Sequence, residues 1–341
     1  MASRSKLLTF LKFALVLTLI VIMLGAWTRL KDAGLGCPDW PFCYGHITVP
    51  VSEQSLTRVS ERFPDHVVEP EKAWPEMIHR YFASAIGFCI LLVAAFMWRR
   101  RTEPGMPWRH GLALLLLVCI QGAFGAWTVT MKLYPPVVTG HLLLGFSTLT
   151  VLYLLYLRTA NAFPATGQRR PAWLPGLLGL TIVALVMQIA LGGWTAANYA
   201  ATICTDLPIC QAGWREVWSP AEAFRLFRPD DANYEFAPHL DAAAKVTIHA
   251  THRMGAFVVT ALMLLLIAGL FFKTQHTRYR VFAGLLAFGL IVQVALGVVN
   301  VVADLPLWNA VAHNVWAAVL LQMLVALAFA LRQESSWRKL Q

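Results

Sequence analysis

Charged side chains are scarce in this sequence. Only 13% of its 341 residues are Asp, Glu, Lys or Arg, whereas 58% are hydrophobic and the mean hydropathy is +0.59. Soluble domains carry roughly twice that share of charge, so the composition excludes a soluble protein. A membrane-spanning helix needs about 20 apolar residues, and eight stretches reach that length: 8–29, 77–98, 110–131, 138–158, 173–195, 246–272, 280–301 and 308–331. The sequence predicts an all-α polytopic membrane protein with eight transmembrane helices.

Acidic residues are almost missing from one set of connections. The termini and the loops that follow the second, fourth and sixth spans hold sixteen Lys and Arg but only two acids, Glu103 and Glu334. The remaining connections hold twelve basic and sixteen acidic residues. Loops rich in Lys and Arg stay in the cytoplasm, so we expect both termini on the cytoplasmic side of the inner (plasma) membrane. The net charge of +10 therefore reflects topology, and no nucleic-acid partner is expected.

Cysteine is also scarce, and no two of the six cysteines show the C-x-x-C spacing of zinc or thioredoxin sites. Four of them form two C-x-D-x-P-x-C motifs, Cys37 with Cys43 and Cys204 with Cys210, in the long outer loops 30–75 and 196–245. Close pairs on the oxidising side of a membrane normally form disulfides, which we predict for both. A redox role for the first pair stays open. We expect these loops to form short helices that lie over the outer ends of the spans.

The two cysteine motifs belong to an internal repeat. Each begins ten residues after a Trp-Thr pair, Trp27-Thr28 and Trp194-Thr195, which gives an offset of 167. Beyond the loops the offset becomes 172 or 173, as at His79 and His252. Repeats of this kind are typical of transporters and other membrane proteins built from duplicated helix sets. We therefore expect two tandem, pseudo-symmetric four-helix bundles, formed by residues 1–160 and 161–341.

Four histidines stand at matched positions near the outer ends of the spans that run inward: His79, His141, His252 and His313. Zinc sites use three or four protein ligands, whereas each half aligns only two imidazoles. Haem iron takes two axial ligands, and helix bundles place such ligands on facing helices. The pattern predicts two haem sites, one between His79 and His141 and one between His252 and His313.

Other polar groups accompany these histidines. Glu76 precedes His79 by three residues, so the two share a helix face. His249 holds the corresponding position before His252, where we expect it to face the haem. Arg80 and Arg253 directly follow the ligands. They are placed either to pair with haem propionates or to reach the lipid headgroups.

Three of the spans also share a Gln-x-x-x-Gly motif, at Gln121 and Gly125, Gln188 and Gly192, and Gln293 and Gly297. Small residues let membrane helices approach closely. The motif is therefore explained either by helix contact or by the room that a flat ligand needs.

Together, Glu-x-x-His-Arg at 76–80, the four matched histidines, the paired outer cysteines and the eight spans in two halves resemble the haem A synthase family. The resemblance implies an oxidoreductase that converts the C8 methyl of haem O to a formyl group by two successive hydroxylations. It further implies that Glu76 is catalytic, that His79 and His141 bind the substrate haem, and that His252 and His313 bind a b-type haem that relays electrons. A haem O synthase would deliver the substrate.

Two other classes are compatible with four histidines in a membrane. A di-haem b-type electron-transfer protein that oxidises a quinol would need the same ligands but would have no use for Glu76. A haem transporter or chaperone would need ligands that release their haem. The sequence assigns no electron acceptor.

Overall fold

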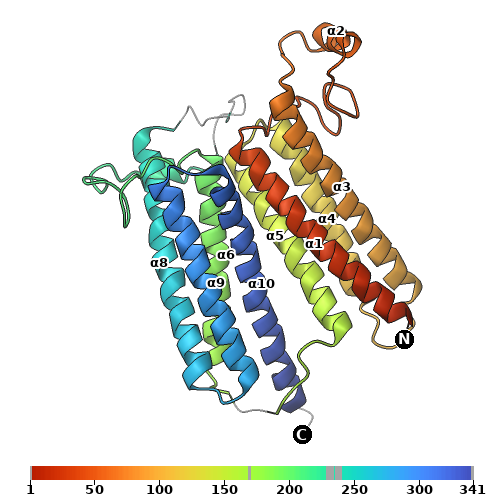
Figure 1. Cartoon of the computed structure of the whole chain (residues 1–341), viewed down its shortest axis with the longest axis vertical. Helices are drawn as coiled ribbons and strands as arrows, with labels where there is room; N and C mark the ends of the chain where they lie inside the picture. Colours follow the sequence, from red (N-terminus) through yellow and green to blue (C-terminus); the bar gives the residue numbers. More distant parts are fainter. Residues whose placement is uncertain (1, 168–169, 228–233, 235–239, 339–341) are drawn as a thin grey trace.

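The computed structural model describes residues 2–167, 170–227, 234 and 240–338, and these form helices joined by loops (Figure 1). Eight of the described helices are long and apolar enough to cross a membrane, which makes the chain a multi-pass membrane protein. They are α1 (Ala2–Leu30), α3 (Pro70–Arg99), α4 (Trp108–Thr130), α5 (Pro135–Ala160), α6 (Leu174–Ala197), α8 (Ala242–Phe272), α9 (Thr277–Val302) and α10 (Leu307–Arg338). All eight predicted spans are confirmed.

These stretches become helices because a bilayer offers no water to their backbone groups, which must then bond within the segment. Large apolar side chains such as Phe88, Phe288 and Ile291 are exposed on the outer surface of the helices, as expected for side chains that contact lipid. Helix α3 differs from the expectation, since it begins at Pro70 and not near residue 77. Proline suits the first turn of a helix because its missing N–H would have no partner there. Glu76 consequently lies between one and two turns inside α3, and His79 lies between two and three turns inside it.

The helices contact one another in two main sets. α1 packs against α3 and α5, and α4 packs against α3 and α5. In the later part of the chain, α8 packs against α6 and α9, and α10 packs against α9 and α6. Contacts of α1 and α5 with α10, and of α5 with α6, join the two sets, which stand side by side in Figure 1. The pseudo-symmetry of the two sets stays a prediction.

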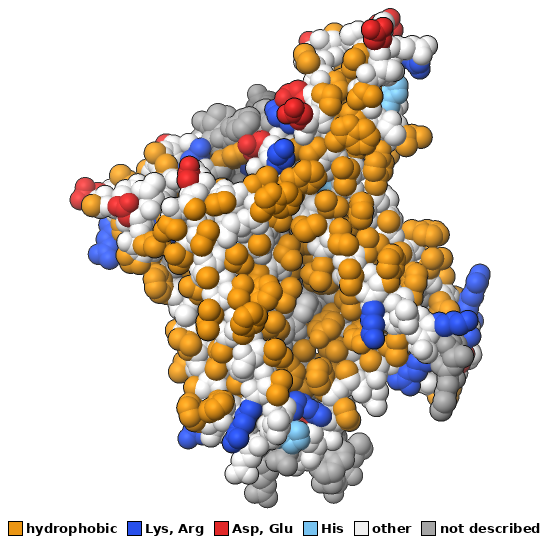
Figure 2. Space-filling model, in the orientation of Figure 1, with side chains coloured by type: hydrophobic (Ala, Val, Ile, Leu, Met, Phe, Trp, Pro, Cys, Tyr) orange, Lys and Arg blue, Asp and Glu red, His pale blue; other side chains and the backbone are white. Residues whose placement is uncertain are grey.

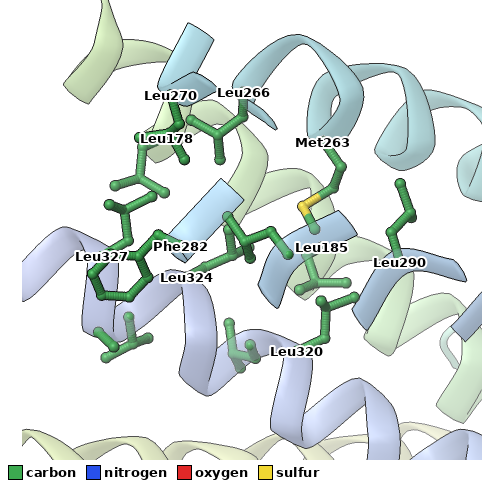
Figure 3. Packing of buried hydrophobic residues seen from close by; sticks show 14 of the residues in the cluster. Leu178, Leu185, Met263, Leu266, Leu270, Phe282, Leu290, Leu320, Leu324 and Leu327 are labelled. Carbon is green, nitrogen blue, oxygen red and sulfur yellow. The ribbon is translucent and has the colours of Figure 1, made fainter. Parts of the chain in front are cut away.

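The buried core of the helices consists mainly of two apolar clusters. A large apolar cluster fills the space between α6, α8, α9 and α10 (Figure 3), and its members Met263, Leu266 and Leu324 are fully buried. A second cluster joins α1, α3 and α5 through Leu11, Ile90 and Leu152. Close packing of this kind resists compression and movement, so both clusters give the histidines a rigid support.

Two long connections lie at one end of the molecule, which we call the loop end. One contains α2 (Glu53–Arg62) and the other contains α7 (Pro220–Ala223), in agreement with the expected short helices. Residues 228–233 and 235–239 of the predicted loop 196–245 lie outside the described part of the chain. Figure 2 shows a band of apolar side chains below this end, acidic side chains gathered at it, and Lys and Arg at the opposite end.

A buried carboxylate closes the end opposite the loops. Glu334 of α10 has no exposed surface. It accepts hydrogen bonds from the backbone N–H of Thr166 (2.7 Å) and of Gly167 (3.0 Å), which belong to the connection between α5 and α6. Arg278 of α9 donates to the carbonyl of Pro164 at 2.9 Å. The connection between the two helix sets is thus fixed to the last two long helices, and we call this contact the Glu334 clasp.

Candidate functional site

Each of the four predicted ligands rests on a glycine of the membrane helix that precedes its own. A methyl group added to Gly25 of α1 would lie 2.9 Å from Cε1 of His79 on α3. The corresponding distance is 3.2 Å at each of the other three positions, which are Gly125 under His141, Gly192 under His252 and Gly297 under His313. A side chain larger than hydrogen would push each imidazole out of its place. The glycines therefore create the space that the rings occupy, and we call Gly25, Gly125, Gly192 and Gly297 the seat glycines, or glycine seats.

The imidazoles of the first pair face each other across the space between α3 and α5. Their ring centroids are 6.4 Å apart and the ring planes are inclined by 83°. Two imidazoles that bind one metal from opposite sides, with bonds of about 2 Å, have centroids roughly 6 Å apart. In the second pair, His252 and His313 occupy the equivalent positions against Gly192 and Gly297.

The donor set suits haem iron better than a bare metal ion. Among the described residues, no group of three or more His, Cys, Asp or Glu side chains could hold a metal ion. Zinc in proteins needs at least three such ligands, whereas haem iron needs two axial ones because the macrocycle supplies the rest. Two imidazoles, each seated against glycine, therefore fit the predicted haem.

The three glutamines of the Gln-x-x-x-Gly motifs all touch a ligand histidine. The side-chain Nε2 of Gln121 donates to the backbone carbonyl of His141 at 3.0 Å, and that of Gln188 donates to the carbonyl of His252 at 2.8 Å. Gln293 Nε2 lies 3.4 Å from the carbonyl of His313 and 3.3 Å from its Nδ1. The motif thus does more than allow helix contact, since it places an amide beside the ligand.

Glu76 is buried, with 5% of its surface exposed, and it is held by donors from the loop and from Arg80. The backbone N–H of Cys37 donates to its Oε2 at 3.0 Å, and Arg80 forms an ion pair with its Oε1. A carboxylate can accept about four hydrogen bonds. The fixed carboxylate of Glu76 therefore keeps acceptor positions for a substrate or water group beside His79.

Arg80 also supports the loop that carries Cys37 and Cys43. Its Nη1 donates to the carbonyls of Phe42 (2.6 Å) and Asp39 (3.0 Å). The carboxylate of Asp39 in turn accepts from the backbone N–H groups of Tyr44 (2.6 Å) and Gly45 (2.7 Å). The guanidinium of Arg80 is thus directed at the loop and at Glu76, and its contact with a haem propionate stays a prediction.

The second half repeats this arrangement without the acid. Arg253 donates to the loop carbonyls of Cys204 (2.5 Å) and Ile209 (3.0 Å). In the place of the ion pair with Glu76, Arg253 Nε donates to Nε2 of the buried His249 at 3.1 Å. His249 thus binds Arg253, and its position facing a haem stays a prediction. The propionate contact of Arg253 remains untested as well.

Both predicted disulfides are present. Cys37 is bonded to Cys43 and Cys204 to Cys210, and each closes a small ring in the loop that the following arginine supports. Because the N–H that binds Glu76 belongs to Cys37, the first ring also fixes the position of the carboxylate. The disulfides therefore act in this structure as supports for the site.

The prediction from sequence missed Gly25 and the role of Gln188 at His252. A signal for Gly25 is present, because Gly-x-Trp-Thr occurs at 25–28, 125–128 and 192–195. Gly25 and Gly192 differ by the offset of 167 that relates the Trp-Thr pairs. The hydrogen bond from Cys37 to Glu76 has no comparable signal, since it depends on how the loop folds back onto α3.

The chain is similar to known proteins over nearly its whole length. The model of the family described as cytochrome oxidase assembly protein, COX15-CtaA, matches residues 8–325. A protein of Shewanella oneidensis described as haem A synthase is 48% identical over 326 residues, which cover 96% of this chain and 97% of that protein. Haem A synthases of Sphingopyxis alaskensis and Beijerinckia indica are 26% and 28% identical and cover 94% and 93% of this chain.

Proposed function

The chain belongs to the COX15-CtaA family of haem A synthases, oxidoreductases that convert haem O to haem A, and we propose that it performs this conversion at the site of His79, His141 and Glu76. The observation that carries the assignment to this half is the asymmetry of the repeat. Both halves have a histidine pair, glycine seats and an arginine under a disulfide loop. Only the first pair has a carboxylate at the position three residues before the ligand, where the second has His249.

The reaction converts the C8 methyl of haem O to a formyl group. In each of two hydroxylations a C–H bond breaks and a C–OH bond forms with an oxygen atom from water, while two protons leave and two electrons pass to an acceptor outside this chain. The resulting geminal diol loses water to give the aldehyde. The carboxylate of Glu76 orients water or accepts a proton at the edge of the macrocycle, because its free acceptor positions lie one helical turn from the ligand His79. Positioned general bases contribute about 10²–10⁴-fold to rate.

His252 and His313 would hold the b-type haem of the second half. When bound, this haem supplies a one-electron centre that can relay the electrons removed from the substrate. The protein's own contribution is to keep both imidazoles fixed by the seats at Gly192 and Gly297. No carboxylate occupies the position of Glu76 here, which suits a site that transfers electrons and does not modify its haem.

The expected topology completes the proposal. Residues 1–160 and 161–341 form two tandem four-helix units, both termini are cytoplasmic, and the haem sites lie toward the outer side of the plasma membrane. The basic residues at the end opposite the loops support this orientation (Figure 2). Haem O would reach the first site from a haem O synthase through the bilayer.

The test is to extract and identify the haems that co-purify with the protein. We expect haem B together with haem O, haem A or the hydroxymethyl intermediate, separated by chromatography. Haem B alone, with no conversion of added haem O, would support an electron carrier and refute the proposed function.

One variant in each half tests which haem that half binds. His313→Ala should lose haem B and keep the substrate haem at least in part, because one imidazole cannot hold low-spin haem as two do. His141→Ala should give the opposite result. Loss of haem B from the second variant and its retention in the first would reverse the assignment of the halves.

A further inference from the structure

One of the four predicted ligands lacks the amide that accompanies the other three. The residue four positions before the seat glycine is Gln121 for His141, Gln188 for His252 and Gln293 for His313. In α1 the corresponding position, four residues before Gly25, is Val21. The offset of 167 pairs Val21 with Gln188 just as it pairs Gly25 with Gly192. The repeat thus contains four glycine seats but only three amides.

The amides carry unused hydrogen-bonding capacity beside the rings. In all three, the side-chain Oε1 is buried and has no hydrogen-bond partner among the residues that the structure describes. A buried polar atom without a hydrogen-bond partner destabilises the folded protein, so it commonly marks a place where a bound ligand supplies the missing hydrogen bond. The Nε2 of Gln188 lies 3.1 Å from Nδ1 of His252, and that of Gln293 lies 3.3 Å from both Nδ1 and Nε2 of His313.

A metal-bound histidine needs an acceptor of this kind. An imidazole that binds iron through Nε2 carries its proton on Nδ1, and histidine ligands almost always donate that proton to a nearby oxygen. This hydrogen bond fixes the tautomer and orientation of the ring and strengthens the ligand. In this structure the donor Nε2 of the amide faces the rings of His252 and His313, and the unpaired Oε1 of the same amide becomes the acceptor for Nδ1–H when the side chain turns.

Nδ1 of His79 and Nδ1 of His141 both lack a hydrogen bond of ordinary geometry within the described part of the chain. Each of these rings faces a backbone carbonyl of the preceding membrane helix, that of Val21 for His79 and that of Gln121 for His141. The two ligands therefore differ in the amide side chain, which His141 has beside it and His79 does not.

We propose that Gln121, Gln188 and Gln293 are positioning residues that fix three of the haem ligands, and that Val21 leaves His79 as the ligand that releases the substrate haem. This inference rests on the proposed function in so far as the first pair holds an exchangeable haem. Haem O enters and haem A leaves by breaking the bond to His79, while His141 keeps its orientation. The b-type haem, held by two amide-supported ligands, stays bound through many turnovers.

The decisive variants are Val21→Gln and Gln121→Val, which exchange the two side chains found in the first half. The protein is purified with its bound haems, an excess of apomyoglobin is added, and transfer of each haem is followed by its absorbance. Val21→Gln should slow the release of the substrate-site haem by about 2- to 10-fold, the effect of one further hydrogen bond. Gln121→Val should accelerate it by a similar factor, and neither should change the release of haem B.

Gln293→Val is the matched variant in the second half. Loss of an outer partner of a ligand typically weakens metal affinity about 10- to 100-fold, so haem B should be released faster while the substrate haem is unaffected. The electron paramagnetic resonance g values of the remaining ferric haem B should also shift, because they report the orientation of the axial imidazoles. A merely structural glutamine would lower the yield of protein and leave these g values unchanged.

The outcomes separate this proposal from the proposed function. Unchanged release from both Val21→Gln and Gln121→Val would overturn the role of His79, even where haem A is formed normally. If Val21→Gln does not fold, Gln121→Val and Gln293→Val decide alone, and native release with native g values in both refutes positioning by the amides. If wild-type protein contains only haem B, the proposed function fails, but the release rates from the two sites still test the amides.

Discussion

At the scale of single residues, the two halves differ most where Glu76 is replaced by His249. The preceding helix, the seat glycine, the ligand, the arginine and the disulfide loop all recur. Glu76 and His249 also make the same kind of contact, since each lies four residues before its arginine and binds it. The duplicated framework therefore makes each residue a control for the other.

Glu76→Gln should keep the helix, the side-chain size and an acceptor for the N–H of Cys37, while it removes the charge. Haem loading should survive, and conversion of haem O should fall about 10²–10⁴-fold because the proton acceptor is lost. Chromatography of extracted haems then shows haem O or the hydroxymethyl intermediate in place of haem A.

His249→Gln is the control for this change, and it should reduce conversion far less. If Glu76 serves only as an acidic residue near a helix N-terminus, worth about 0.3–1 kcal/mol, Glu76→Gln would lower the melting temperature slightly. Near-normal haem A from this variant would then contradict the catalytic role.

The sequence predicted the four histidines and Glu76 but did not show how they are held. The histidines were recognisable because the repeat places them at equal depths in apolar segments, where polar side chains are expensive. The partners of Arg80 were not recognisable, because it donates to backbone carbonyls of Asp39 and Phe42. Carbonyls are present at every residue, so no pattern of side chains indicates which of them an arginine will reach.

At the scale of elements, the first disulfide loop and α3 form one unit. Arg80 and Glu76 project from α3 and bind the carbonyl and N–H groups of the loop. Tyr44, Val59 and Met77 pack together beneath it. The span prediction began α3 near residue 77 because hydropathy detects only the apolar part of a helix. The polar residues from Pro70 onward extend α3 beyond its apolar part, toward the loop that Glu76 and Arg80 bind.

Arg80→Gln should loosen this loop. Hydrogen bonds to a charged group contribute about 1.5–3 kcal/mol each, so loss of the guanidinium should make local opening about 10- to 100-fold more frequent. Limited digestion of the purified protein with proteinase K should show faster cleavage within residues 31–52, mapped by mass spectrometry after reduction.

Arg58→Gln on the exposed face of α2 provides the control for general loop mobility and should be cut at the wild-type rate. Equal cleavage of wild type and Arg80→Gln would show that the disulfide ring holds its shape without the arginine.

At the scale of the whole molecule, the sequence predicted the number and positions of the spans because length and apolarity suffice for that purpose. It also predicted which connections are basic, and these lie opposite the loop end (Figure 2). The contacts that join the two helix sets were not predictable. They include the stacking of Trp27 on Trp308 and the hydrogen bond from Arg29 to the carbonyl of Ala196 at 2.7 Å, both between residues far apart in the chain.

The expected orientation can be measured with single cysteines. In a chain whose free Cys89 and Cys119 are replaced by Ala, Ser60→Cys lies in the loop with α2 and Thr102→Cys lies at the opposite end. A membrane-impermeant maleimide should label Ser60→Cys in intact spheroplasts and Thr102→Cys only after lysis, because basic connections stay in the cytoplasm. The reverse labelling pattern would show that the protein has the opposite orientation in the membrane, with both haem sites on the cytoplasmic side.

The Glu334 clasp also sets an order of events during synthesis. Glu334 is 167 residues later in the chain than Gly167, whose N–H it binds. Ribosomes add about 5–20 residues per second, so the connection after α5 waits roughly ten to thirty seconds for its partner. During that interval α1, α3, α4 and α5 have left the ribosome and can pack together, while α6 to α10 are still being made. The clasp is therefore among the last contacts to form, and it closes only on a chain whose final helix has been translated.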